Sequence, residues 1–123
     1  MNIQLTYHRR QTTTTHVGSL SIGSEHPVRI QTMANTSTND IEGSVAQAER
    51  CEAAGTELLR FTTQGMREVE SLAQIHHVLQ EKRSHTPLVA DVHFQSDVAD
   101  AAAKVVEKVR INPGNYIDPA RKF

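Results

Sequence analysis

Arg60, His93 and Arg110 are the residues of this sequence whose types and positions best suit chemistry on a charged ligand. Each lies in a short stretch rich in apolar and β-branched residues. A guanidinium is costly to bury unless it is paired or meets an anion, and it offers charge-assisted hydrogen bonds that match phosphate oxygens. If the three stretches are neighbouring strands, the two guanidiniums and the imidazole converge on a site that suits phosphate or diphosphate.

Asp91 lies two residues before His93, and therefore on the same face of the same predicted strand. Its carboxylate could orient a bound group or the imidazole and would offset part of the positive charge. Alternatively, Asp91 and Arg60 pair with each other as a structural ion bridge. The sequence leaves both interpretations open. Asn112 follows Arg110 by two residues and shares its face of the last predicted strand.

The elements that must position these side chains alternate along the chain. Four segments have the composition of strands that turn polar at their carboxyl ends, and three segments between them have the apolar spacing of helices. The predicted strands are Val28–Met33, Glu57–Thr62, Pro87–Phe94 and Lys108–Asn112, and the predicted helices are Asp40–Ala54, Met66–Glu81 and Val98–Val106. Such alternation builds a parallel sheet with its ligand site at the carboxyl ends of the strands. The expected fold class is therefore α/β.

An entry segment precedes this pattern. Thr13–Gly23 has β-forming residues around two glycines, which predicts a hairpin that covers the bottom of a barrel. Asn39 and Glu42 have the spacing of a helix N-cap and its reciprocal partner, and Gly55 suits the position after the C-cap.

Histidine and cysteine do not predict a metal site in this chain. His76 and His77 are adjacent on a predicted helix and cannot both face one ion, so we expect a solvated surface pair. Cys51 lies on the apolar stripe of the first helix, and we expect an inert core thiol. Because it is the only cysteine, it can form no internal disulfide and cannot by itself hold a metal cluster.

Composition limits the remaining possibilities. The chain has 123 residues, which allows one domain at most, and 13 basic against 14 acidic residues give a formal net charge of −1. This balance favours neither nucleic acid nor a bare membrane surface as partner. The sequence has no apolar run long enough for a membrane span and no signal peptide near Met1, so we expect a soluble, cytoplasmic protein.

Three motifs occur together and in order: Arg29–Thr36, Pro87–Phe94 and Arg110–Asn115. Together they closely resemble the N-terminal part of the hydroxymethylbutenyl diphosphate synthase family, the iron–sulfur enzymes of the non-mevalonate (MEP) isoprenoid pathway. The resemblance runs from about Arg9 to the end of the chain. The ending Asn115–Phe123 resembles the longer form of the family, which carries an inserted domain.

The resemblance implies the N-terminal half of a (β/α)₈ TIM barrel that binds 2-C-methyl-D-erythritol 2,4-cyclodiphosphate at its carboxyl mouth. The full enzyme would be an oxidoreductase that converts this compound to 4-hydroxy-3-methylbut-2-enyl diphosphate. By match to the motifs, the diphosphate would be bound by Arg60, His93 and Arg110, with Asn35, Asp91 and Asn112 around the same pocket. The resemblance also implies a [4Fe-4S] cluster in a separate C-terminal domain, a flavodoxin or ferredoxin type electron donor, and a homodimer.

The chain departs from the family in one large respect, because the cluster needs three cysteines and a carboxylate and only Cys51 is present. We therefore expect one partial barrel domain, with a hairpin segment at residues 1–23 and the first βα units at 24–123. The insertion and cluster domains would lie beyond Phe123, and this piece alone would be inactive. Two alternatives remain: a pterin-binding barrel similar to dihydropteroate synthases, and a non-catalytic anion-binding module.

Overall fold

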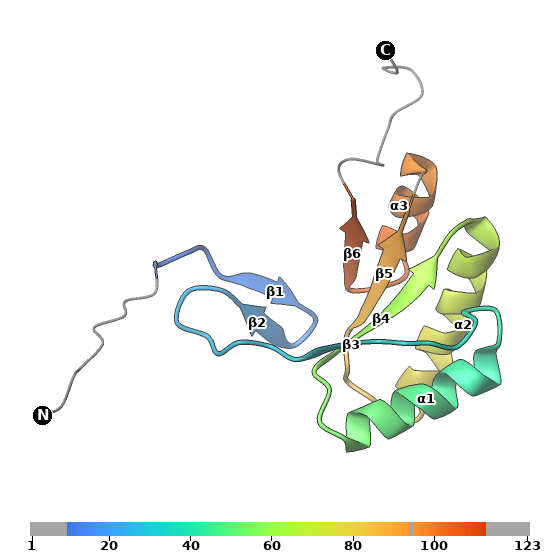
Figure 1. Cartoon of the computed structure of the whole chain (residues 1–123), viewed down its shortest axis with the longest axis horizontal. Coiled ribbons are helices and arrows are strands. Elements are labelled where there is room, and N and C mark those ends of the chain that lie inside the picture. Colours follow the sequence, from blue (N-terminus) through green and yellow to red (C-terminus); the bar gives the residue numbers. More distant parts are fainter. Residues whose placement is uncertain (1–9, 94, 113–123) are drawn as a thin grey trace, which may run out of the picture.

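The computed structural model of the chain describes residues 10–93 and 95–112. Its elements follow one another as an N-terminal pair of short strands and then a strand–helix alternation (Figure 1). In chain order they are β1 (Thr15–Val17), β2 (Leu20–Ile22), β3 (Gln31–Met33), α1 (Ile41–Ala53), β4 (Leu58–Thr63), α2 (Met66–Glu81), β5 (Leu88–Val92), α3 (Ser96–Ala103) and β6 (Lys108–Ile111). No helix in this described part of the chain is long and apolar enough to cross a membrane.

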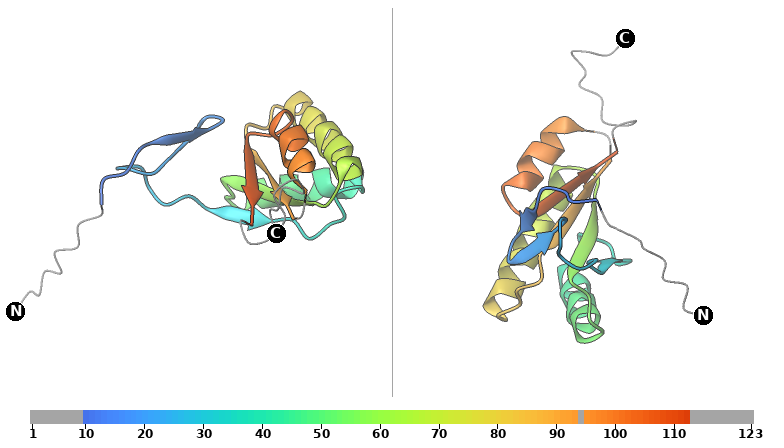
Figure 2. Two further views of the ribbon diagram at one scale, coloured as in Figure 1. Left: turned by 90° about the horizontal axis from the view of Figure 1, so that it is seen from above. Right: turned by 90° about the vertical axis from the view of Figure 1, so that its left-hand side faces the viewer.

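The strands β3 to β6 form one parallel sheet in sequence order, and β1 and β2 form a separate antiparallel hairpin. All three helices cover one face of the sheet, and the hairpin lies on the other side (Figure 2). The predicted class is confirmed: the fold is α/β, with a four-stranded parallel sheet, three helices and an N-terminal hairpin. This arrangement is consistent with part of a TIM barrel.

Alternate residues of the central strands form the core against the helices. Leu59 and Phe61 of β4 and Leu88 and Ala90 of β5 are all at most 1% exposed. The helix α2 has the predicted bounds and turns its apolar stripe toward these strands, with Val69, Leu72, Ile75 and Leu79 buried. Because side chains alternate along a strand, the residues between these core positions face the opposite side of the sheet.

The hairpin packs against the amino ends of the sheet strands. Val17 of β1 forms a small apolar cluster with Leu58 and Val89, which begin or nearly begin their strands. Arg29 ties the hairpin to the sheet, since its Nε donates to the Ser21 carbonyl at 3.0 Å and its Nη1 pairs with a Glu57 carboxylate oxygen at 3.0 Å. The predicted hairpin is confirmed, and it lies at the amino ends of the sheet strands.

The cap of α1 differs from the prediction. Asp40, not Asn39, is the N-cap, and its Oδ1 accepts a hydrogen bond from the Gly43 amide at 3.1 Å. Asn39 instead accepts a 2.7 Å hydrogen bond from the Ser71 hydroxyl on α2. The Asn39 side chain therefore contacts α2 instead of capping α1. At the other end, Gly55 follows the C-cap with φ of +102°, as predicted for the residue after a helix.

Replacing Asp40 with Ala should lower the free energy of unfolding by about 1 kcal/mol, because the Gly43 amide loses its side-chain acceptor. Hydrogen exchange should show faster exchange at Gly43, and denaturant unfolding gives the stability. Asn39→Ala is the matched control, since it leaves the Gly43 amide capped. Faster exchange of Gly43 in the control than in Asp40→Ala would contradict the observed cap.

The first sheet strand and the third helix differ most from their predicted bounds. The first sheet strand is Gln31–Met33 rather than Val28–Met33, and Val28 is 83% exposed ahead of it. The third helix starts at Ser96 and ends at Ala103 instead of running from Val98 to Val106. Its N-cap is Gln95, which makes no side-chain capping bond. The last residues of the third motif, Pro113–Asn115, lie outside the described residues.

Candidate functional site

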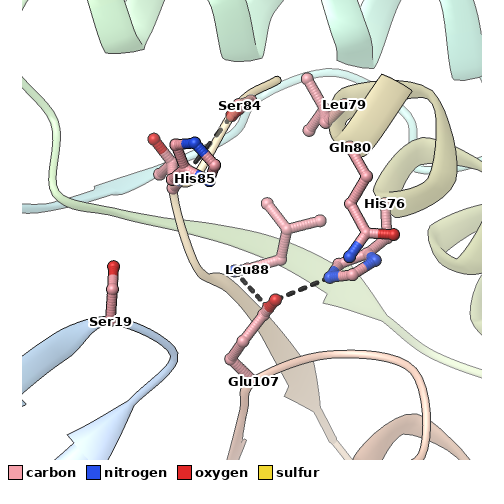
Figure 3. A pocket seen from close by; sticks show the side chains of 9 residues that line it. Ser19, His76, Leu79, Gln80, Ser84, His85, Leu88 and Glu107 are labelled. Atoms are coloured by element: carbon pink, nitrogen blue, oxygen red, sulfur yellow. Dashed lines mark hydrogen bonds and ion pairs between the residues drawn. The ribbon is translucent and has the colours of Figure 1, made fainter. Parts of the chain in front are cut away.

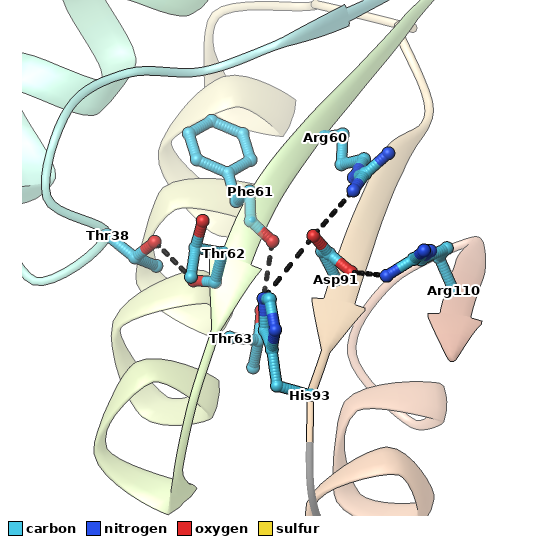
Figure 4. A network of polar contacts seen from close by, with 8 residues as sticks. All are labelled: Thr38, Arg60, Phe61, Thr62, Thr63, Asp91, His93 and Arg110. Carbon is cyan, nitrogen blue, oxygen red and sulfur yellow. Dashed lines mark hydrogen bonds and ion pairs between the residues drawn. The ribbon is translucent and has the colours of Figure 1, made fainter. Parts of the chain in front are cut away.

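Asp91 is the centre of a cluster that contains Arg60, His93 and Arg110, the three residues named first from the sequence (Figure 4). Its Oδ2 lies 2.7 Å from Nη2 of Arg60, and its Oδ1 lies 3.0 Å from Nη1 of Arg110. Nε2 of His93 lies 3.5 Å from Oδ2 of the same carboxylate. The prediction that Arg60, His93 and Arg110 converge near the ends of adjacent strands is therefore confirmed as geometry.

The strand register explains why these side chains meet. Asp91 on β5 is directly opposite Arg110 on β6, and Arg60 on β4 is opposite Val89, two residues before Asp91. Opposite residues of a parallel ladder project to the same side, which here is the side away from the helices. The cluster therefore lies on the inner face of the sheet. Arg60 follows Leu58 by two residues and Asp91 follows Val89 by two residues, so both charged side chains lie nearer the carboxyl ends than this apolar pair.

Asp91 remains ionised in this environment. The carboxylate is 1% exposed, and burial alone would raise its pKa. The hydrogen bonds from Arg60 and Arg110 and the positive charges of Arg60 and His93 outweigh that burial, so the pKa of Asp91 lies below its ordinary value. Asp91 is thus a permanent negative charge between two guanidiniums over the physiological range.

The cluster retains capacity for an anion after these internal contacts. Two guanidiniums and one carboxylate leave a net charge of +1, before any contribution from His93. Each guanidinium has more N–H donors than its contact with Asp91 uses. Among the described residues Arg60 Nε has no hydrogen-bond partner, although solvent does not reach it. The side chains of Arg110 and His93 are 38% and 33% exposed, so a ligand has access to both.

These contacts confirm one of the two roles that the sequence left open for Asp91, the structural ion bridge to Arg60. The Arg60–Asp91 pair exists as a structural ion bridge, and the same carboxylate also holds Arg110. Because Asp91 fixes one edge of each guanidinium, the remaining donors of both are held in fixed directions. A preorganised pair of guanidiniums is well suited to phosphate oxygens.

The two asparagines of the predicted site follow the two edge strands of the sheet, β3 and β6. Asn35 follows β3 and lines a cavity of about 320 Å³ at the carboxyl ends of β3 and β4, together with Thr38 and Thr62. Thr38 is anchored there by a 2.6 Å hydrogen bond from its hydroxyl to the Thr62 carbonyl (Figure 4). Asn112 is half-buried directly after β6, two residues beyond Arg110.

The sequence reasoning missed the residues of α1 that hold the Asn35 loop. Gln47 bonds the backbone and the side chain of Asn35, and the buried Ser44 bonds Thr36 and Ser37. The available signal was position: Ser44 and Gln47 lie three residues apart, on the side of α1 that also carries the buried Ala48. Polar residues at such positions indicate hydrogen bonding to a neighbouring loop.

A second cavity of about 330 Å³ lies at the opposite, amino end of β5 (Figure 3). Its wall includes His76, whose Nε2 lies 2.6 Å from Oε1 of Glu107, while the other oxygen of Glu107 accepts the Leu88 amide at 2.9 Å. The prediction of a solvated histidine pair is wrong for His76, which joins α2 to the strand ends. It holds for His77, which is 71% exposed beside Glu81.

The residues described here do not fit an iron–sulfur cluster. Such clusters are held mainly by cysteine thiolates, and the sequence contains one cysteine. Cys51 was predicted to be a core thiol; it packs against the core but is only partly buried. Within residues 10–93 and 95–112, no group of three or more histidine, cysteine or acidic side chains is placed to hold a metal ion.

The parallel sheet, the helices on one face and the polar residues near the strand ends define the chain as a segment of a TIM barrel. A model of the GcpE TIM-barrel domain matches residues 12–122. The chain therefore belongs to the GcpE TIM-barrel domain family.

Three curated relatives to which the chain is similar are named as 4-hydroxy-3-methylbut-2-en-1-yl diphosphate synthases. The chain is 53% identical over 117 residues to "4-hydroxy-3-methylbut-2-en-1-yl diphosphate synthase (flavodoxin)" of Parabacteroides distasonis, covering 95% of this chain and 19% of the relative. It is 45% identical over 115 residues to the protein of the same name from Chlamydia muridarum, covering 94% and 19%. It is 42% identical over 115 residues to "4-hydroxy-3-methylbut-2-en-1-yl diphosphate synthase (ferredoxin), chloroplastic" of Arabidopsis thaliana, covering 94% and 16%. The chain thus spans about a fifth of the length of these relatives.

Proposed function

We propose that this chain is the substrate-binding part of a 4-hydroxy-3-methylbut-2-enyl diphosphate synthase. The substrate is 2-C-methyl-D-erythritol 2,4-cyclodiphosphate, and the reaction is its reductive conversion in the MEP pathway. The observation that carries the proposal is the cluster of Arg60, His93 and Arg110 around Asp91 at the inner face of the sheet. The family and the names of the relatives agree with this reaction.

The side chains of this segment bind and orient the diphosphate. Arg60 and Arg110 direct their remaining N–H donors toward its oxygens, and Asp91 keeps both guanidiniums in place. His93 adds a nearby imidazole, while Asn35 and Asn112 provide polar contacts after the two edge strands, β3 and β6. These groups neutralise and position charge, and none of them is a reductant.

The redox chemistry requires parts of the protein outside this chain. In the proposal, insertion and [4Fe-4S] domains belong to the full-length enzyme, since the residues described here do not fit the cluster. A flavodoxin or ferredoxin type protein supplies the electrons, in keeping with the names of the relatives. The full enzyme acts as a homodimer in the cytoplasm, and the 123-residue chain alone binds substrate weakly and turns over none.

Replacing Arg110 with Ala should weaken binding of the cyclodiphosphate by about 1.5–3 kcal/mol, the usual worth of a hydrogen bond to a charged group. We expect the lower half of that range, because the Arg110 side chain is 38% exposed. Isothermal titration calorimetry on the 123-residue chain measures the effect. Arg50→Ala is the matched control, because Arg50 is exposed in the last turn of α1, at the amino end of the sheet.

Competing ligands separate this function from the alternatives. A synthase segment should prefer the cyclodiphosphate to inorganic pyrophosphate, whereas a non-catalytic anion-binding module should take both about equally. A barrel of the dihydropteroate synthase type should bind a pterin in competition with the cyclodiphosphate. Unchanged affinity in Arg110→Ala would remove Arg110 from the site and with it the observation on which the proposal rests.

A further inference from the structure

The loop after β3 is held to α1 by a reciprocal set of hydrogen bonds. Oε1 of Gln47 accepts from the backbone amides of Asn35 at 3.0 Å and Thr36 at 3.4 Å. Nε2 of Gln47 donates to Oδ1 of Asn35 at 2.5 Å. One helix side chain therefore fixes both the backbone and the carboxamide of Asn35.

The chemistry of these partners leaves only one orientation for the Asn35 amide. A backbone N–H can only donate, so the Gln47 atom that meets the Asn35 and Thr36 amides must be its oxygen. The other terminal atom of Gln47 is then its NH₂ group, which can only donate to Asn35. The Asn35 atom that receives this bond must be its carbonyl oxygen, so the NH₂ group of Asn35 lies on the side away from Gln47.

Asn35 is exposed and lines the cavity of about 320 Å³ at the carboxyl ends of β3 and β4. Along the register Met33 is opposite Arg60, and Asn35 follows Met33 by two residues toward the carboxyl side of the sheet. With its oxygen engaged by Gln47, Asn35 offers hydrogen-bond donors to this region. Donors suit the oxygens of an anion, and acceptors oppose them.

We propose that Gln47 is a positioning residue that sets the Asn35 amide as a hydrogen-bond donor to the anionic ligand of the Arg60–Asp91–Arg110 cluster. This inference rests on the proposed function, since it assigns Asn35 to the same ligand. Gln47 does not touch the ligand and acts only through Asn35. The ligand chemistry it selects is an oxyanion such as a diphosphate.

Gln47→Glu is the informative variant. A glutamate at this position still accepts from the two backbone amides, but it has no donor for Oδ1 of Asn35. The Asn35 amide must then turn its NH₂ group toward the glutamate. This rotation presents the Asn35 side-chain oxygen to the ligand. We expect inorganic pyrophosphate, used as the probe, to bind about tenfold more weakly, as for the loss of one hydrogen bond to a charged group.

The added negative charge could weaken pyrophosphate binding by itself, and a double-mutant cycle separates the two effects. In the Asn35→Ala background, Gln47→Glu should change the affinity less than threefold, because no amide remains to be turned. Gln74→Glu on α2, which adds the same charge at an exposed position, is the matched control and should leave the affinity unchanged. An equal loss in both backgrounds would mean simple charge repulsion and would overturn the inference.

A measurement on the unsubstituted chain does not depend on the folding of any variant. During a pyrophosphate titration followed by NMR, the side-chain NH₂ signals of Asn35 should shift more than those of Gln47. If they stay in place at saturation, the inference is overturned. If Arg110→Ala weakens binding but Gln47→Glu does not, the inference alone fails; if the unsubstituted chain binds no pyrophosphate or cyclodiphosphate, the proposed function fails with it.

Discussion

Replacing Asp91 with Asn should lower the free energy of unfolding by about 2–4 kcal/mol. The carboxylate is 1% exposed and accepts from both Arg60 and Arg110, so its loss leaves two guanidiniums facing each other without the charge that separates them. Removing one member of a fully buried pair costs roughly 3–5 kcal/mol. We expect somewhat less, because the arginine side chains are 23% and 38% exposed and can regain water.

Denaturant unfolding gives the free energy of unfolding of Asp91→Asn, with Glu49→Gln as the control variant. Glu49 pairs with Lys82 at 2.7 Å, but both side chains are about half exposed, so breaking that pair should cost less than about 1 kcal/mol. If the two variants lose equal stability, the cluster at Asp91 is no stronger than a surface ion pair.

The acid dependence of stability provides a second readout for Asp91. Since the pKa of Asp91 is lower in the folded chain than in the unfolded chain, its ionised form stabilises the fold at neutral pH. That contribution is complete above the ordinary aspartate range near pH 4 and is lost as the pH falls through the lowered folded value. The Asp91→Asn variant should lack this part of the acid dependence. A variant as acid-sensitive as the unsubstituted chain would show that other carboxylates cause the loss.

Replacing Phe61 with Ala should cost about 3–5 kcal/mol of stability, the range for deleting a fully buried aromatic side chain. Phe61 is 0% exposed and lies on the helix side of β4, between Arg60 and Thr62 on the inner side. The total stability of small domains is commonly about 5–15 kcal/mol, so this change should remove a large part of the free energy of unfolding. Thermal and denaturant unfolding of the variant test it.

Met33→Ala is the control for Phe61→Ala. Met33 is also a large apolar residue of the sheet, but it is 48% exposed, so its truncation should have a small effect. Comparable losses in the two variants would contradict the core described for β4.

Much of the fold could be predicted because local pattern and tertiary structure agree. The helix Met66–Glu81 has its predicted bounds, since its apolar residues recur at helical spacing. The strands containing Arg60, Asp91 and Arg110 were placed to within a residue or two, because apolar positions alternate up to the polar carboxyl ends. These three strands carry most of the candidate site.

The differences arise where distant residues decide the structure. Asn39 left its predicted cap position for Ser71 on α2, a contact that no local pattern contains. The first sheet strand starts only at Gln31. The Ile30 carbonyl still accepts from the Leu58 amide at 3.0 Å, but the Ile30 amide donates to the Glu57 side chain instead of to the backbone of β4. Likewise, the double contact of Asp91 depends on the register that sets it opposite Arg110, and sequence spacing does not give that register.

The apolar layer formed by Val17, Leu58 and Val89 has an electrostatic consequence for ligand capture. It lies directly beneath the inner-face charges and is at most 4% exposed, so counterions and water are kept from that side. A low-dielectric wall under a charged cluster concentrates the potential on the opposite side. If the cluster binds an anion as proposed, the attraction of Arg60 and Arg110 is directed outward past the strand ends and would act on the anion before the first hydrogen bond forms.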